Sequence, residues 1–169
     1  MTINLMNKTN AVKGGKFLLI LILVYVILSV LIGLIPIELI ELLIAKTVML
    51  FTGGKIVFQN PVLILFENYS IQISYLCTGL LEFILLTSAL IATQGITKEK
   101  KISGIVGAGI ATFLFNVSRI VITISLIENS SIETIELAHD LLFRISLFVL
   151  IAGYYFVWYY FSVKKSDKK

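Results

Sequence analysis

The sequence contains few reactive and few charged side chains. It has one cysteine, one histidine and two prolines in 169 residues, and only 14% of its residues are charged. A soluble domain usually has about 25% charged residues. A single cysteine excludes an internal disulfide framework and any metal site built from several cysteines. The 14 lysines and arginines are spread thinly beside apolar runs, which argues against nucleic-acid binding and against intrinsic disorder.

Hydrophobic residues, in contrast, make up 58% of the chain, and the mean hydropathy is +1.00. A helix that crosses a membrane needs about 20 mostly apolar residues. We therefore predict an all-α integral membrane protein, with residues 1–169 forming a single membrane domain. Four runs are long enough to span, namely residues 17–35, 77–96, 103–127 and 139–163.

The positions of the basic residues predict the orientation of these spans. Ten of the 14 basic residues lie in three groups, before the first span, between the second and third, and after the fourth. Basic residues are retained on the cytoplasmic side of a membrane. Four spans place all three groups and both termini in the cytoplasm, whereas a fifth span at residues 37–51 would place residues 98–101 outside. The prediction is thus a multi-pass protein of the cell membrane with residues 36–76 outside.

The external segment begins with a stretch that has the pattern of an amphipathic helix. Residues 37–51 carry apolar side chains at helical spacing, with Glu38 and Glu41 turned away from them. The apolar positions are Ile37, Ile40, Ile44 and Phe51. Such a pattern is typical of a helix that lies on the membrane surface.

The second half of the external segment has the pattern of a β-hairpin. Two extended runs, residues 62–66 and 71–76, flank a turn-like stretch at residues 67–70, and the second run alternates apolar with polar residues. A short hairpin here leads the chain directly into Cys77.

Three unusual side chains fall in the same outer leaflet under this topology. Cys77 begins the second span, His139 begins the fourth, and Arg119 lies about 12 Å below the outer end of the third. An arginine inside a membrane is costly and faces protein or water, which makes it a candidate functional residue. It belongs to a polar stripe at helical spacing, composed of Thr112, Asn116, Arg119 and Thr123.

Each of these residues also has a structural interpretation. A lone cysteine in an apolar helix is often a small buried hydrophobe, and a lone histidine at a helix end is often interfacial. The stripe could pair helices through Glu82. Small residues in the inner half of the third span, Gly104, Gly107, Ala108, Gly109 and Ala111, are interpreted as plain helix packing.

Considered together, the three side chains have the chemistry of a cysteine nucleophile. A thiolate is stabilised by nearby cations or by a helix N-terminus. His139 could take the thiol proton and donate it to a leaving amine, and Arg119 could stabilise an oxyanion. Thr78 and Gly79 after the cysteine keep the approach narrow and polar.

Two acidic residues are candidates for supporting roles. Glu82 could orient Arg119, although a simple packing pair is equally compatible with the sequence. Asp140 could pair with Arg144 and orient the last helix, although an ordinary pair four residues apart explains this spacing as well.

These motifs resemble those of the exosortase/archaeosortase family of multi-spanning membrane cysteine transpeptidases. The shared features are Cys77-Thr78-Gly79 opening a membrane helix, Asn116 three residues before Arg119 in the next helix, and a later His139. The resemblance covers roughly residues 56–163 and is closest to a compact, archaeosortase-like member.

The resemblance implies a function and a set of site residues. Cys77 would be the nucleophile, Arg119 the stabiliser of the oxyanion or substrate, and His139 the general acid and base, with Thr78, Gly79, Glu82, Asn116 and Asp140 in support and with no metal or cofactor. The substrates would be exported proteins that end in a recognition motif, a transmembrane helix and a basic tail. The enzyme would cleave this sorting signal and transfer the new C-terminus to a membrane lipid or similar acceptor.

Two other classes of function remain open at this stage. One is a small transporter or channel subunit in which Glu82 and Arg119 line a polar path. The other is a non-catalytic membrane assembly protein whose polar residues only pair helices. Neither requires a Cys-Thr-Gly sequence after an extended segment.

Overall fold

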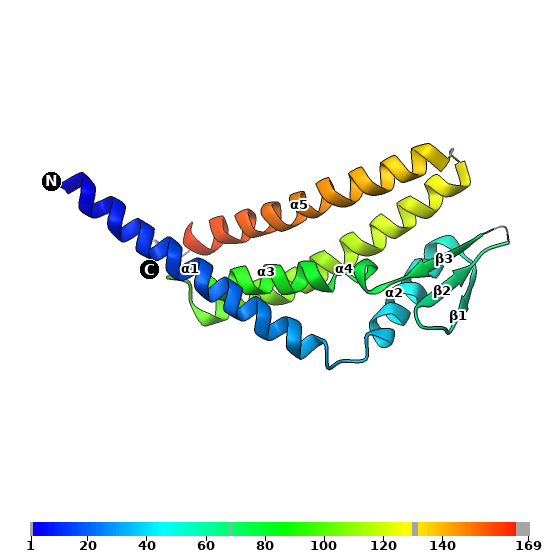
Figure 1. The fold of residues 1–169 in the computed structure, drawn as a ribbon, viewed down its shortest axis with the longest axis horizontal. Helices are drawn as coiled ribbons and strands as arrows, with labels where there is room; N and C mark the ends of the chain where they lie inside the picture. Colours follow the sequence, from blue (N-terminus) through cyan, green and yellow to red (C-terminus); the bar gives the residue numbers. More distant parts are fainter. Residues whose placement is uncertain (1, 68, 130–131, 165–169) are drawn as a thin grey trace.

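The computed structural model describes residues 2–67, 69–129 and 132–164, and gives only the backbone for residues 2–11, 128–129, 132–144 and 164. Within these ranges the chain is mostly helical, as predicted (Figure 1). The α-helices are α1 (Thr2–Ile32), α2 (Ile37–Thr52), α3 (Leu80–Ala92), α4 (Lys98–Asn129) and α5 (Ile132–Lys164).

Three of the helices are long and apolar enough to cross a membrane. The candidate spans are Val12–Ile32 in α1, Lys98–Ile127 in α4 and Ile145–Val163 in α5. The fourth expected span, residues 77–96, corresponds to α3, which has only 13 residues and is therefore about 20 Å long. It is shorter than the hydrocarbon core because turns at Gly79 and Gly95, both with positive φ, end the helix on either side.

The outer boundaries of the expected spans also need correction. Cys77 lies in a 3₁₀ turn, η1 (Tyr75–Cys77), three residues before α3, and not at the start of the helix. His139 lies inside α5, which begins seven residues earlier at Ile132. The expected span included only the apolar residues of this region. The helical backbone of α5 starts earlier because it also includes the charged residues Glu133 and Glu136.

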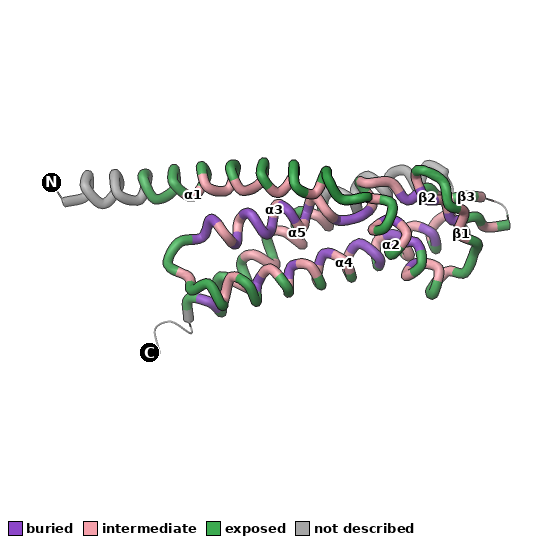
Figure 2. Tube along the Cα trace, turned by 90° about the horizontal axis from the view of Figure 1, so that it is seen from below, coloured by how far each residue is buried: buried purple, intermediate pink, exposed green. Residues whose placement is uncertain are grey.

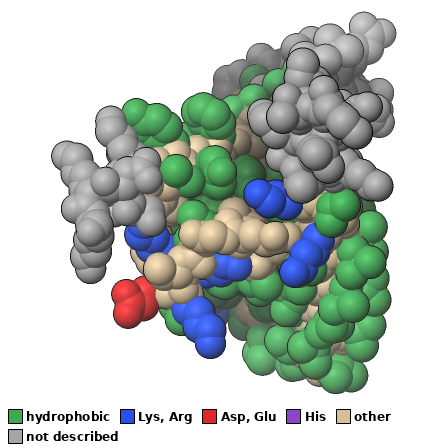
Figure 3. Space-filling view, turned by 90° about the vertical axis from the view of Figure 1, so that its left-hand side faces the viewer, with side chains coloured by type: hydrophobic (Ala, Val, Ile, Leu, Met, Phe, Trp, Pro, Cys, Tyr) green, Lys and Arg blue, Asp and Glu red, His purple; other side chains and the backbone are tan. Residues whose placement is uncertain are grey.

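The helices form an elongated bundle with two different ends. Helix α1 packs along α3, and α3 also contacts α4 and α5. The start of α1, the α3–α4 loop and the end of α5 lie at one end, and α2 and the sheet lie at the other (Figures 1 and 2). The basic side chains gather on the first of these ends (Figure 3), which we call the lysine end. Its described lysines are Lys13, Lys16, Lys98, Lys100 and Lys101.

A small antiparallel sheet contains the expected hairpin. Strands β2 (Val62–Leu65) and β3 (Ser70–Ile73) pair with Val62 opposite Ile73, which confirms the hairpin. A third strand, β1 (Lys55–Val57), pairs with the other edge of β2. Three residues were too short a run to be recognised as a strand from the sequence.

The sheet and α2 pack against the second half of α4. The fully or nearly buried residues of this core are Ile44, Ala45, Val48, Val62, Ile64, Ile73, Val117, Ile120 and Ile124. Cys77 packs at the edge of the same core. These contacts therefore fix the position of the Cys77 turn along the length of α4.

Helix α2 forms as predicted, but its buried face differs from the expected one. Glu41 is buried at 4% exposure beside Ile44, whereas Phe51 is 70% exposed. The expected face grouped Phe51 with Ile44 and turned Glu41 away. The buried face follows the contacts of α2 with α4 and the sheet, and these contacts are not visible in the helical periodicity of α2 alone.

Candidate active site

Cys77 is held in a tight turn directly after strand β3. Its backbone N–H donates to the carbonyl of Ser74 at 2.8 Å. The hydroxyl of the buried Thr78 donates to the carbonyl of Tyr75 at 2.6 Å. The Cys77 thiol is free and half-buried, and its Sγ lies 3.6 Å from Oγ of Ser74. The thiol is therefore fixed in position without being sealed in the core.

Gly79 allows this turn to lie directly against α4. Its φ of +74° is in the left-handed region that favours glycine. A Cβ at this position would lie 3.4 Å from Cβ of Asn116 and 3.5 Å from the carbonyl oxygen of Thr112. The backbone conformation therefore favours glycine in the Cys-Thr-Gly sequence, and the turn lies in van der Waals contact with α4.

Asn116 joins the turn to α4 by a hydrogen bond. Its side-chain amide donates to the carbonyl oxygen of Cys77, and the residue is buried at 4% exposure. Thr112, one turn before it, is equally buried and donates its hydroxyl to the carbonyl of Ala108 at 2.8 Å. The polar stripe of α4 thus faces the Cys77 turn.

Arg119 lies one turn beyond Asn116 and reaches the thiol. Its guanidinium lies close enough to the Cys77 side chain and to Glu82 for its charge to interact with both. It also lines a cavity of about 110 Å³ that continues to α5. The other lining residues are Phe115, Ser118, Ile122 and Ser146. Arg119 therefore has the thiol and an open space beside it.

Glu82 supplies a carboxylate in the first turn of α3. It is buried at 8% exposure, and among the described residues its Oε2 atom has no hydrogen-bond partner. Burial, followed by the neighbouring Tyr25 and Glu82, raises the pKa of Tyr75 above its usual value. Tyr75 therefore stays protonated at neutral pH beside the Cys77 turn.

The remaining residues of the expected site belong to α5. His139 and Asp140, with Arg144, have side chains outside the described part of the structure. His139 precedes Ser146 by two helical turns, which places both residues on the same face of α5. It lies about 10 Å along α5 from the level of the Arg119 cavity, toward the junction with α4.

The structure brings together the expected residues Cys77, Thr78, Gly79, Glu82, Asn116 and Arg119. It adds Ser74 and Tyr75, which the sequence analysis did not single out. Ser74 lies three residues before Cys77, which is one turn of a 3₁₀-helix, and its hydroxyl is therefore close to the thiol. That turn becomes recognisable only once the end of β3 is known.

Comparisons of the chain with protein-family models, with curated proteins and with solved structures gave no match.

Proposed function

We propose that the chain is a membrane-embedded cysteine peptidase or transpeptidase with Cys77 as its nucleophile. The observation that supports this most strongly is the double contact from one face of α4. Asn116 bonds the backbone of Cys77, and the charge of Arg119 lies beside the Cys77 side chain. A fixed thiol beside a guanidinium is the arrangement that acyl transfer needs.

The proposed reaction has two steps. The Cys77 thiolate attacks the carbonyl carbon of the scissile peptide bond, and Arg119 stabilises the negative oxygen that forms. The C–N bond then breaks, and His139 donates a proton to the departing amine, which leaves a thioester on Cys77. An acceptor hydroxyl, amine or water attacks this thioester, passes its proton to His139 and releases the thiol.

The surroundings of Glu82 argue for this role over a purely structural ion pair. A pair that existed only to neutralise Arg119 would be expected to use both carboxylate oxygens of Glu82. Oε2 of Glu82 has no hydrogen-bond partner among the described residues, although the charge of Glu82 acts on Arg119. In the proposal, Glu82 supports the charge of Arg119, and Arg119 acts on Cys77 and on the substrate.

The proposal includes four crossing helices with both termini in the cytoplasm of a cell-membrane protein. The clustering of lysines at one end supports this orientation (Figure 3). Helix α3 leads from that end to the Cys77 turn, and α2 and the sheet pack on α4 beyond it. The short α3 and these packed elements would together fill the fourth crossing, with the thiol in the outer leaflet.

The proposed substrates are those implied by the resemblance to exosortases and archaeosortases. They are exported proteins with a C-terminal motif, a transmembrane helix and a basic tail, and the acceptor is a membrane lipid. The cavity beside Arg119 lies between α4 and α5, where it borders residues of both candidate spans. It would admit a peptide segment to the thiol from the side of the bundle.

Processing of such a tailed surface protein in cells that express the chain tests the proposal. Cys77→Ala and Cys77→Ser should abolish the shift in substrate mass. Thr47→Ala should preserve it, because the Thr47 hydroxyl bonds the Leu43 carbonyl of its own helix and the residue does not line the Arg119 cavity. Unchanged processing by Cys77→Ala would refute the proposal.

The two other classes predict different results in the same cells. A transporter loses flux on charge reversal at Glu82 or Arg119 while Cys77→Ala is silent. An assembly protein leaves Cys77 unreactive toward a membrane-impermeant thiol reagent. Because Cys77 is the only cysteine, labelling of the chain reports on this residue directly.

A further inference from the structure

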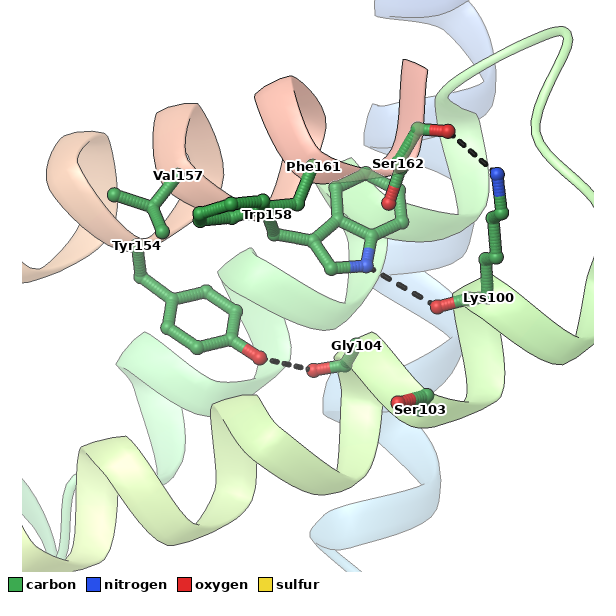
Figure 4. A pocket seen from close by; sticks show the side chains of 8 residues that line it. All are labelled: Lys100, Ser103, Gly104, Tyr154, Val157, Trp158, Phe161 and Ser162. Carbon is green, nitrogen blue, oxygen red and sulfur yellow. Dashed lines mark hydrogen bonds between the residues drawn. The ribbon is translucent and has the colours of Figure 1, made fainter. Parts of the chain in front are cut away.

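A second cavity lies at the lysine end, between the start of α4 and the end of α5 (Figure 4). It has a volume of about 340 Å³. Its lining residues are Lys100, Ser103, Gly104, Tyr154, Val157, Trp158, Phe161 and Ser162. The cavity therefore combines one cation with aromatic and aliphatic walls, and it is separate from the Cys77 site.

Hydrogen bonds to the backbone of α4 hold the aromatic walls in place. Nε1 of Trp158 donates to the carbonyl of Lys100 at 3.1 Å, and the hydroxyl of Tyr154 donates to the carbonyl of Gly104 at 2.6 Å (Figure 4). A Cβ on Gly104 would clash with the Trp158 indole. Glycine at this position thus makes room for the indole, and the cavity is formed by defined contacts.

The cation at the rim retains capacity to bind an anion. Nζ of Lys100 donates to the carbonyl of Ser162 at 2.6 Å (Figure 4), and an ammonium group has three N–H donors. Lys98 is exposed two residues earlier, in the same first turn of α4. Basic side chains gather on this end of the molecule (Figure 3), where Glu99 is also exposed.

The cavity lies at the level where two candidate spans end. Lys100 is in the first turn of the span Lys98–Ile127, and Ser162 is one residue before the end of the span Ile145–Val163. Tryptophan and tyrosine are typical of this interfacial level. Two apolar lining residues of α5 are exposed, namely Phe161 beside Ser162 at 65% and Val157, about one turn closer to the middle of the helix, at 53%. A ligand here would meet basic groups at one end and apolar surface at the other.

We propose that this cavity binds an anionic phospholipid of the leaflet that contains the lysine end. The phosphate bonds Lys100, and an acyl chain lies against Val157, Phe161 and the Trp158 ring. Basic pockets between spanning helices select anionic headgroups over zwitterionic ones, whose own cation is repelled by the lysines. The site does not depend on the function proposed for Cys77.

Trp158 makes this proposal directly measurable because it is the only tryptophan in the chain. The full chain is placed in phosphatidylcholine nanodiscs that contain a small, equal fraction of either phosphatidylglycerol or phosphatidylcholine with brominated acyl chains. Bromine quenches indole fluorescence only at close range. The proposal predicts that brominated phosphatidylglycerol quenches Trp158 at about fivefold lower lipid fraction, which is the preference expected for one lysine–headgroup contact.

Two variants and one control connect that preference to the cavity. Lys100→Gln and Ser103→Asp should each remove the preference, the first by losing the cation and the second by placing a carboxylate at the exposed rim. Lys13→Gln should keep it, because Lys13 is an exposed lysine of the same end that does not line the cavity. Helical circular dichroism checks that each variant is folded.

Three results would overturn the proposal. The first is equal quenching by the two brominated lipids, and the second is an unchanged preference in both Lys100→Gln and Ser103→Asp. The third is relief of quenching by added inorganic phosphate at constant ionic strength, since this would make the ligand a phosphate ion and not a lipid.

Discussion

At the lysine end, polar side chains bond to backbone carbonyls near helix ends, whereas at the Cys77 turn they converge on one another. Lys101 donates to the carbonyl of Ile91 in the last turn of α3, and Lys100 donates to that of Ser162 near the end of α5. Asn116 and Arg119 instead both engage Cys77, one at its carbonyl and the other at its side chain.

The difference separates two uses of polar groups inside an apolar bundle. Lysines that bond the last carbonyls of helices satisfy backbone acceptors and favour the negative end of the helix dipole. The guanidinium of Arg119 lies beside a thiol, which is not a backbone acceptor. A guanidinium at this position would stabilise the negative charge that the thiol, or an oxygen formed beside it, carries during a reaction.

Removal of one cation at each end gives the largest expected contrast. Arg119→Gln should slow substrate processing by about 10²- to 10³-fold, the usual effect of losing an oxyanion-stabilising group. Lys101→Gln should leave the processing rate unchanged, because its ammonium bonds only the Ile91 carbonyl in the part of the structure described. Initial rates measured at equal amounts of folded protein check both variants. Equal effects of the two substitutions would contradict the distinction between the ends.

Two glycines with similar backbone conformation give the next contrast. Gly79 and Gly95 have φ values of +74° and +78°, but only Gly79 would bring a Cβ against α4. Gly95→Ala should destabilise the protein by about 1 kcal/mol, the cost of a left-handed alanine. Gly79→Ala should cost a similar amount for its backbone conformation, but its methyl group would also lie in van der Waals contact with Asn116 and should change the position of the thiol.

Unfolding in mixed micelles and the rate of Cys77 labelling by a maleimide measure these two effects. We expect a changed labelling rate in Gly79→Ala and the rate of the unaltered chain in Gly95→Ala. The same labelling rate in both variants would mean that the position of the thiol does not depend on the packing of the turn on α4.

The smallest effect is expected in the packing of α4 on α5. Gly104→Ala should destabilise the bundle by about 1 kcal/mol, because the added methyl displaces the Trp158 indole and outweighs the gain in helix propensity. Gly153→Ala, which meets no atom within 4 Å, should be neutral or stabilising by up to about 1 kcal/mol. The emission maximum of Trp158 should shift only in Gly104→Ala. A shift in neither variant would argue against a close fit of the indole over Gly104.

The parts of the fold that could be predicted are those set by local sequence. Long apolar runs predicted the spans in α1, α4 and α5, and alternation predicted the pairing of β2 with β3. The length of α3 could not be predicted in this way, because its sequence stays apolar through the turns at both ends. The left-handed glycines that end it resemble any other glycine in a hydrophobic run.

The residues of the candidate site could be predicted from the sequence, but the contacts among them could not. Spacing along α4 placed Asn116 and Arg119 on one face, and the hairpin led to Cys77. The hydrogen bond from Asn116 to the Cys77 carbonyl and the burial of Glu41 depend on packing between segments far apart in sequence. The spacing of apolar residues along a helix or a strand does not reveal such contacts.

Trapping of the acyl-enzyme tests the central claim most directly. The purified chain is mixed with a tailed substrate, quenched in acid and examined by intact-mass and peptide mass spectrometry. We predict a mass increase on the peptide that contains Cys77, equal to the N-terminal substrate fragment and removed by hydroxylamine. The adduct should be absent in Cys77→Ala. Substrate cleavage with no hydroxylamine-sensitive adduct on the Cys77 peptide at any quench time would contradict the assignment of Cys77 as the nucleophile.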